Sequence, residues 1–222
     1  MTLRPVKSLF LIIVVVACVQ AQQQPATTNK WEAEIRKFEE ADRKTPPPKD
    51  AVLFVGSSSI RLWSSLDEDF PSVKIINRGF GGSDIEDSTH YVGRIVTPYR
   101  PRLIVLYAGD NDLANGKSPE QVSEDFRAFV GRVRRDLPQS RIAFISIKPS
   151  PARQHLIEKQ KAANGMIKKY ISREKGLSYI DVFTPMLGKD GGMRPELFVG
   201  DGLHLNKEGY ALWKSVAAPH LR

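Results

Sequence analysis

The fold is constrained most strongly by the alternation of short apolar runs with longer amphipathic stretches from residue 51 onward. Five runs rich in β-forming residues are expected to be strands, at 51–55, 73–76, 103–107, 142–147 and 177–180. Helical patterns separate them at 84–96, 119–136 and 154–175, and Asn206 is expected to cap a last helix. Strands that alternate with helices form a parallel sheet covered on both faces, so the sequence predicts a single α/β domain.

The first residues follow a different pattern. Arg4 and Lys7 precede an apolar run over 9–19 that is too short to span a bilayer and is followed by small residues, as is typical of a signal peptide cleaved after Ala21. We therefore expect a secreted or periplasmic protein. The expected division is a signal peptide over 1–21, a polar tether with an N-terminal helix over 22–48, and the main domain over 49–222.

Cys18 is the only cysteine of the chain, and it leaves a second export route open. Residues 15–18 also resemble a lipoprotein processing site, in which Cys18 would carry lipid and hold the protein at a membrane. With ordinary cleavage after Ala21, the mature chain would have no cysteine. That would exclude a disulfide, a cysteine metal site and a thiol nucleophile.

The charge is basic but dispersed. Removing the leader takes away two basic residues and lowers the net charge from +8 to +6. The remaining lysines and arginines alternate with apolar positions in the predicted helices, a pattern that favours solvated helix faces over a nucleic-acid surface. We expect no nucleic-acid partner, while attraction to an acidic glycan or an anionic membrane remains open.

A run of three serines follows the first predicted strand and Gly56. Ser58 would stand at the end of that strand, where its own backbone N–H can point at an oxyanion, and a helix is expected to begin at about Ile60. The alternative is that these serines only cap the helix. The second glycine of a G-x-S-x-G elbow is missing, which argues against the standard α/β-hydrolase arrangement.

Two further loops supply candidate hydrogen-bond donors for an oxyanion. The glycine-rich segment 77–84 follows the second strand and offers the N–H of Gly82, although the segment taken alone is more typical of a plain turn that ends at a helix cap by Asp84. Asn111 follows the third strand, and its neutral amide can donate without changing protonation state. Its acidic neighbours Asp110 and Asp112 lack a histidine-rich partner motif, so no metal is predicted.

The last segment with recognisable chemistry contains Asp201 and His204. A carboxylate three residues before an imidazole can fix its tautomer and stabilise the imidazolium, which makes His204 the candidate base and Asp201 its orienting partner. The other histidines lie in predicted helices without a comparable acidic partner motif. Arg153, in a proline-rich loop after the fourth strand, could hold a substrate, or the loop could be only a rigid connection.

Taken in order, these segments resemble the SGNH hydrolase superfamily, also called GDSL esterases and lipases, and most closely the group similar to platelet-activating-factor acetylhydrolase catalytic subunits. The resemblance runs from about residue 51 to the C-terminus and is carried by residues 52–59, 77–82, 109–112, 201–206 and 209–210. It implies a flavodoxin-like three-layer α/β/α sandwich with a five-stranded parallel sheet. It also implies that no metal or organic cofactor is needed.

The resemblance assigns roles residue by residue. Ser58 matches the nucleophile, Asp201 and His204 match the rest of the triad, and Gly82 and Asn111 match the oxyanion donors, together with the N–H of Ser58. One departure is that the usual Gly-Asp-Ser-Leu reads Gly-Ser-Ser-Ser here, so Ser57 replaces the aspartate, and Ser57 and Ser59 are alternative nucleophiles.

The expected function is an exported esterase that removes a small acyl group, acetyl first of all, from a carbohydrate or related ester. A lysophospholipase or thioesterase with the same triad is the nearest alternative. A non-catalytic carbohydrate-binding or envelope protein is a third, since a fold alone does not fix function.

Overall fold

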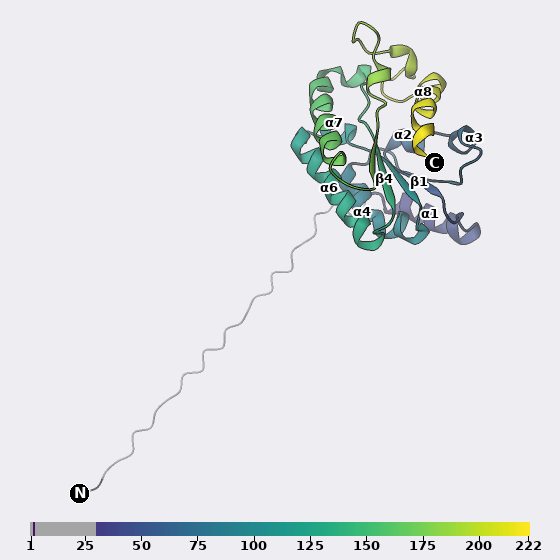
Figure 1. Cartoon of the computed structure of the whole chain (residues 1–222), viewed down its shortest axis with the longest axis vertical. Coiled ribbons are helices and arrows are strands. Elements are labelled where there is room, and N and C mark those ends of the chain that lie inside the picture. The colour runs from purple at the N-terminus through teal and green to yellow at the C-terminus, as the bar shows by residue number, and fades with distance from the viewer. Residues whose placement is uncertain (1, 3–29) are drawn as a thin grey trace.

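A parallel β-sheet organises the molecule, as seen in a computed structural model that describes residue 2 and residues 30–222 (Figure 1). The expected signal peptide, its cleavage site and Cys18 lie outside the described residues. The strands are β1 (Val52–Gly56), β2 (Ile75–Gly79), β3 (Leu103–Tyr107), β4 (Arg141–Ile145) and β5 (Leu177–Ile180). All pairings are parallel and the spatial order is β2-β1-β3-β4-β5, which confirms the predicted five-stranded α/β sheet.

Helices cover both faces of the sheet and give three layers (Figure 1). One core lies under α1 (Glu32–Lys44), α4 (Ile85–Ile95), α6 (Pro119–Asp136) and α7 (Ile157–Ile171). The other lies under α2 (Ser58–Arg61), α3 (Leu66–Asp69) and α8 (Lys207–Ala217). Alternate residues of β1 enter the two cores, with Leu53 in the first and Phe54 in the second, because successive strand side chains point to opposite faces. The remaining helix is α5 (Asp110–Ala114), and short 3₁₀ segments occur at Thr97–Tyr99, Pro151–Leu156, Thr184–Met186, Pro195–Leu197 and Ala218–His220.

Several element boundaries differ from the expected ones, and the structure shows the cause of three of these differences. β2 begins at Ile75 rather than at residue 73, because the N–H of Val73 closes a turn onto the carbonyl of Phe70. β4 stops at Ile145, and the backbone N–H and C=O of Ile147 are both taken by the Asn164 side chain. The expected helix over 154–175 is instead the 3₁₀ segment Pro151–Leu156, with non-helical backbone angles at Arg153 inside it, followed by α7, which ends at Ile171.

Helix α1, which the sequence places before the main domain, packs into the same core as the sheet. Ile35 is fully buried, and the Trp31 ring meets Phe80 edge-on with 5.7 Å between the ring centroids. Arg94 of α4 forms ion pairs with two residues of α1, Glu32 at 2.6 Å and Glu39 at 2.7 Å. The start of α1 is therefore fixed beside the loop that follows β2.

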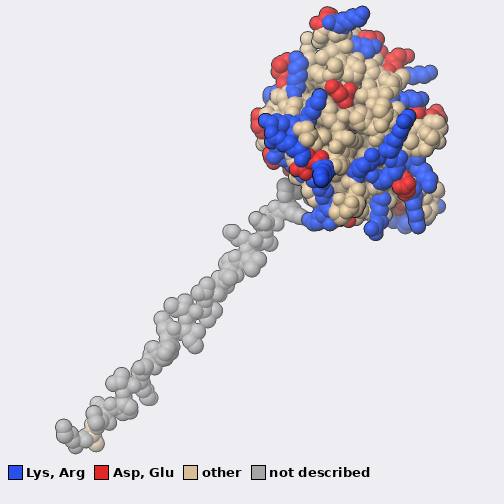
Figure 2. All heavy atoms as spheres, in the orientation of Figure 1, with Lys and Arg blue, Asp and Glu red and all other residues tan. Residues whose placement is uncertain are grey.

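The surface carries charges of both signs. Figure 2 shows lysine and arginine side chains over much of one face, with acidic side chains between them and an uncharged area at its centre. Within residues 30–222, no helix combines the length and the apolar character needed to cross a membrane.

Candidate active site

The turn after β1 brings Ser58 to the carboxyl edge of the sheet. Gly56 has φ +131°, and a Cβ at this position would lie 1.9 Å from the carbonyl oxygen of Tyr107, so the turn requires glycine. The N–H of Ser57 donates to that same carbonyl at 2.9 Å, which ties the turn to β3. Ser58 then opens α2, whose carbonyls at Ser59 and Ile60 accept hydrogen bonds from side chains of other elements. The serine is thereby held on a short, anchored helix.

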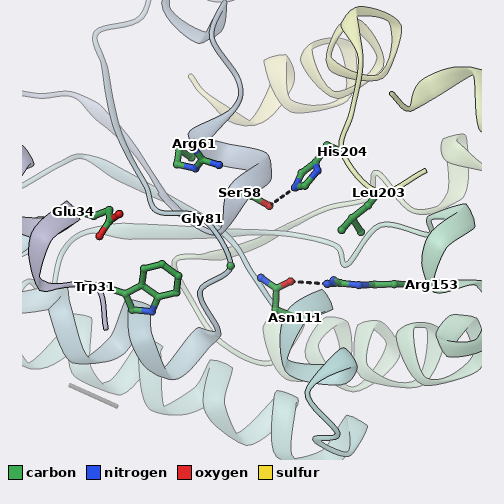
Figure 3. A pocket seen from close by; sticks show the side chains of 10 residues that line it. Trp31, Glu34, Ser58, Arg61, Gly81, Asn111, Arg153, Leu203 and His204 are labelled. Atoms are coloured by element: carbon green, nitrogen blue, oxygen red, sulfur yellow. Dashed lines mark hydrogen bonds between the residues drawn. The ribbon is translucent and has the colours of Figure 1, made fainter. Parts of the chain in front are cut away.

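Ser58, His204 and Asp201 form a continuous chain of side-chain contacts (Figure 3 shows the first of them). His204 Nε2 lies 3.1 Å from Ser58 Oγ, and His204 Nδ1 lies 2.6 Å from Asp201 Oδ2. A carboxylate can only accept, so it selects the tautomer with the proton on Nδ1 and leaves Nε2 free to accept from the serine hydroxyl. The arrangement can therefore remove a proton from Ser58.

The Asp201 carboxylate also organises the loop that carries the histidine. Asp201 Oδ1 accepts hydrogen bonds from the N–H groups of Leu203 at 2.8 Å and His204 at 2.9 Å. The bond from the His204 N–H is the largest of the effects that lower the pKa of Asp201 to about 2. The carboxylate is thus ionised at any pH at which an esterase would be assayed.

The loop after β2 and helix α5 are fastened to each other. Gly82 has φ +74° and lies on the rim of the pocket, where a Cβ would be 3.5 Å from the Trp31 ring. Asn111 Nδ2 donates to the carbonyl oxygen of Ser83 at 3.0 Å, and the Asp112 carboxylate accepts from the N–H of Ile85 at 3.1 Å. These bonds hold the loop that carries Gly82 against the helix that carries Asn111, and both predicted oxyanion donors line the same pocket.

The Asp112 side chain is completely buried, which makes its ionisation unfavourable. Burial, and secondly the nearby Asp84, raise the pKa of Asp112 to about 7. Lys117 Nζ lies 3.6 Å from Asp112 Oδ1 but is also bound to Asp125 at 2.6 Å, so its charge is shared. The ionised form of Asp112 is consequently unfavourable in the folded protein.

Behind Asn111 lies a buried group of charged side chains. Arg153 Nη2 donates to Asn111 Oδ1 at 2.8 Å, while Arg153 Nη1 forms an ion pair with Asp110 Oδ2 at 2.9 Å without hydrogen-bond geometry. Lys148 Nζ donates to the same Asp110 oxygen at 3.0 Å and to the Tyr107 hydroxyl at 3.2 Å. Burial alone would raise the pKa of Asp110, but the charges of Lys148 and Arg153 outweigh it and keep that pKa below its ordinary value.

These loops enclose a pocket of about 550 Å³ (Figure 3). It is lined by Trp31, Glu34, Ser58, Arg61, Gly81, Gly82, Asn111, Arg153, Leu203 and His204. Every site residue expected from the sequence lines this pocket except Asp201, which contacts His204 from behind. Arg153 lies at the expected edge, with its guanidinium engaged by Asn111 and Asp110.

Sequence reasoning did not anticipate Lys148 as a buried cation or Trp31, Glu34 and Arg61 as pocket residues. A lysine at the end of an apolar strand and directly before a proline was the available signal for Lys148. Trp31 precedes α1 and Glu34 lies within it, far in sequence from the other site residues, and no local motif marks them. Among residues 30–222, no three His, Cys, Asp or Glu side chains are grouped closely enough to hold a metal ion.

The chain is similar to known proteins over most of its length. Residues 51–212 match the model of the GDSL-like Lipase/Acylhydrolase family. The platelet-activating factor acetylhydrolase IB subunit alpha1 of Pongo abelii is 26% identical over 179 residues, which cover 77% of this chain and 74% of the relative. A solved Streptococcus pneumonia protein described as a platelet activating factor superposes with TM-score 0.76 at 23% identity, covering 88% of this chain and 94% of the other.

A third similar structure is a carbohydrate esterase family 3 protein from Talaromyces cellulolyticus, with TM-score 0.64 and 17% identity over 77% of this chain and 95% of the other. The resemblance in fold agrees with the flavodoxin-like sandwich expected from the sequence. With the family match spanning most of the domain, the chain belongs to the GDSL-like lipase/acylhydrolase family of carboxylic ester hydrolases, within the SGNH hydrolase superfamily.

Proposed function

We propose that the protein is an exported serine esterase that removes small acyl groups, acetyl above all, from carbohydrate or related esters. The observation that carries the proposal is the hydrogen-bonded chain from Ser58 Oγ through His204 to Asp201 at the wall of an open pocket. In this proposal Ser58 is the nucleophile and His204 the general base. Asp201 orients the imidazole and stabilises its protonated form.

Acylation begins when Ser58 Oγ attacks the carbonyl carbon of the ester. As the new C–O bond forms, the Oγ proton passes to His204 Nε2 and the carbonyl π electrons move onto the oxygen. The N–H groups of Ser58 and Gly82 and the side-chain amide of Asn111 stabilise that oxyanion. The oxyanion then collapses, the bond to the alcohol oxygen breaks, and His204 returns its proton to the departing alcohol.

Deacylation repeats these steps with water. His204 takes a proton from the water molecule as its oxygen attacks the acyl carbon of the Ser58 ester, and a second oxyanion forms in the same place. Its collapse breaks the bond to Ser58 Oγ, which recovers the proton from His204. The products are the free carboxylic acid and the regenerated enzyme, so the cycle needs no further reactant.

The composition of the pocket supports a small acyl group and a polar alcohol. Among the described residues that line it, Leu203 is the one aliphatic side chain, and the charged side chains of Glu34 and Arg61 stand at the rim. A long acyl chain needs an extended apolar surface, which these residues do not offer. Glu34, Arg61 and the Trp31 ring are side chains of the kinds that bind hydroxyl-rich molecules by hydrogen bonds and ring contacts.

The named relatives are consistent with this choice. One is called an acetylhydrolase and another is a carbohydrate esterase, so both the acyl group and the type of alcohol have precedents on this fold. At 26% and 17% identity to this chain, these two proteins support the proposal. Export rests on the leader sequence and on Cys18 or Ala21 as the processing site.

The test is a series of p-nitrophenyl esters from acetate through butyrate to octanoate, with Ser58→Ala as the matched control. We expect hydrolysis that depends on Ser58 and falls sharply beyond the shortest acyl groups. A maximum at octanoate would favour a lipase or lysophospholipase instead. A folded wild-type protein that cleaves none of these esters, nor an acetylated xylan, would favour the non-catalytic binding protein.

The processing site has a separate test. Intact mass spectrometry of the mature protein from an exporting host should give a chain beginning at Gln22. A mass that includes diacylglycerol on Cys18 would show the lipoprotein route instead.

A further inference from the structure

We infer that Arg153 is a positioning residue that holds and polarises the Asn111 amide, rather than a residue that binds substrate. The inference rests on the proposed function, because it concerns the donor that Asn111 supplies to the oxyanion. It follows from the contacts of Arg153 with Asn111 and Asp110 (Figure 3 shows the first).

The first step is the orientation of the amide. Asn111 Oδ1 accepts from Arg153 Nη2 at 2.8 Å, and Asn111 Nδ2 donates to the Ser83 carbonyl at 3.0 Å. Exchanging the two ends of the amide would put its NH₂ against a guanidinium and its oxygen against a carbonyl. Both contacts would be repulsive, so the amide has one stable orientation, and Nδ2 keeps one N–H that is not used by Ser83.

The second step is the anchoring of Arg153 itself. Its Nη1 lies 2.9 Å from Asp110 Oδ2, and that oxygen also accepts from Lys148 Nζ at 3.0 Å. The side chains of Asp110 and Lys148 are 5% and 1% exposed, so this ion pair lies in the interior, where charges interact strongly. Arg153 is 15% exposed and forms the outer member of the group. A buried carboxylate therefore fixes the guanidinium at the distance that Asn111 requires.

The third step is the effect on catalysis. A hydrogen bond from a cation to Oδ1 draws electron density from the amide, which strengthens Nδ2–H as a donor. A stronger and correctly aimed donor matters most when negative charge develops on the substrate oxygen. Loss of Arg153 should consequently lower kcat more than it raises KM. A residue that binds the ground-state substrate would produce the opposite division.

The experiment is a double-mutant cycle on p-nitrophenyl acetate with Arg153→Ala, Asn111→Ala and the double variant. We expect Arg153→Ala to lower kcat by about 10- to 100-fold, less than the about 100- to 1000-fold typical of removing an oxyanion donor outright. In the Asn111→Ala background, the same change should alter kcat by less than about 2-fold, because its target is absent.

Arg134→Ala is the matched control. Arg134 also forms an ion pair, with Glu174 at 2.8 Å, but lies on α6 and does not line the pocket. Its loss should leave kcat and KM unchanged. If Arg153→Ala fails to fold by circular dichroism, Arg153→Lys replaces it in the cycle, because lysine keeps a cation beside Asp110 without the planar fork that also reaches Asn111.

Two results would overturn the inference while leaving the esterase proposal intact. One is an active wild-type enzyme in which Arg153→Ala raises KM and leaves kcat unchanged, which would make Arg153 a substrate-binding residue. The other is a loss of kcat that is equally large with and without Asn111. Failure of the proposed function is distinct, since the wild type itself would then show no hydrolysis dependent on Ser58.

Discussion

Replacing Asp201 with asparagine should inactivate the enzyme even though the two side chains have nearly the same shape. Asp201 Oδ1 is held by the N–H groups of Leu203 and His204, at 2.8 and 2.9 Å. In the Asp201→Asn variant the amide oxygen must keep that place, since an NH₂ group there would face two donors. The NH₂ then faces His204 Nδ1, which becomes an acceptor and moves the ring proton to Nε2.

That tautomer cannot accept the proton of Ser58. To recover the working tautomer, the variant would have to set two N–H groups against each other across the present 2.6 Å contact. We expect kcat to fall by about 10⁴-fold, as asparagine does at the same position of other Ser-His-Asp enzymes. This corresponds to about 5.5 kcal/mol of lost transition-state stabilisation.

Assays of p-nitrophenyl acetate hydrolysis by the wild type, Asp201→Asn and Asp201→Ala would measure the loss of kcat. Asp201→Asn keeps the acceptor for both backbone N–H groups but loses the charge that they stabilise, so its thermal unfolding temperature should lie slightly below that of the wild type. The alanine variant leaves the imidazole free to adopt either tautomer but also removes the acceptor of both backbone N–H groups, so comparing the two variants separates the tautomer effect from the loss of loop anchoring. An asparagine variant within about 10-fold of wild-type kcat would refute the orienting role of Asp201.

Three further predictions concern pH and stability. The pH–rate profile should show no step near about pH 4 from the Asp201 carboxyl, because the pKa of Asp201 is lowered to about 2; a step at that pH would contradict this. The raised pKa of Asp112, about 7 against an ordinary 3.8, means that the folded protein keeps a proton that the unfolded chain releases. The free energy of unfolding should therefore fall by roughly 4 kcal/mol between about pH 4 and pH 7. Urea unfolding should show this fall in the wild type and not in Asp112→Asn. The same pH dependence in both proteins would count against the prediction. Gly56→Ala would put a Cβ 1.9 Å from the Tyr107 carbonyl and should destabilise the fold by more than about 4 kcal/mol, whereas an unchanged urea midpoint would disprove the need for glycine.

The fold could be predicted from the sequence because its strands are short apolar runs bounded by polar and turn-forming residues. The expected strands 103–107 and 177–180 and the helix 119–136 have the same bounds in the structure. Some of the misplaced boundaries depend on contacts that no local pattern encodes. The end of β4 is an example, because Asn164 binds the backbone of Ile147 from 17 residues away.

The site was predictable to the extent that each residue belongs to a short motif. Ser58 and Asn111 meet at one pocket because the parallel strands before them end on the same edge of the sheet, and His204 reaches that pocket from the loop before α8. The contributions of Trp31 and Lys148 were not predictable. Trp31 reaches the pocket through the packing of α1 against Phe80, and Lys148 is tolerated in the interior only because Asp110 neutralises it.

The central claim is that Ser58 is the nucleophile, among three adjacent serines. The most direct measurement is labelling with a fluorophosphonate, which forms a bond to an activated serine oxygen with loss of fluoride, followed by peptide mapping by mass spectrometry. The account predicts a single adduct on Ser58, absent from Ser58→Ala and strongly reduced when His204 is replaced by alanine. An adduct on Ser57 or Ser59, or an active wild-type enzyme that is never labelled, would contradict it.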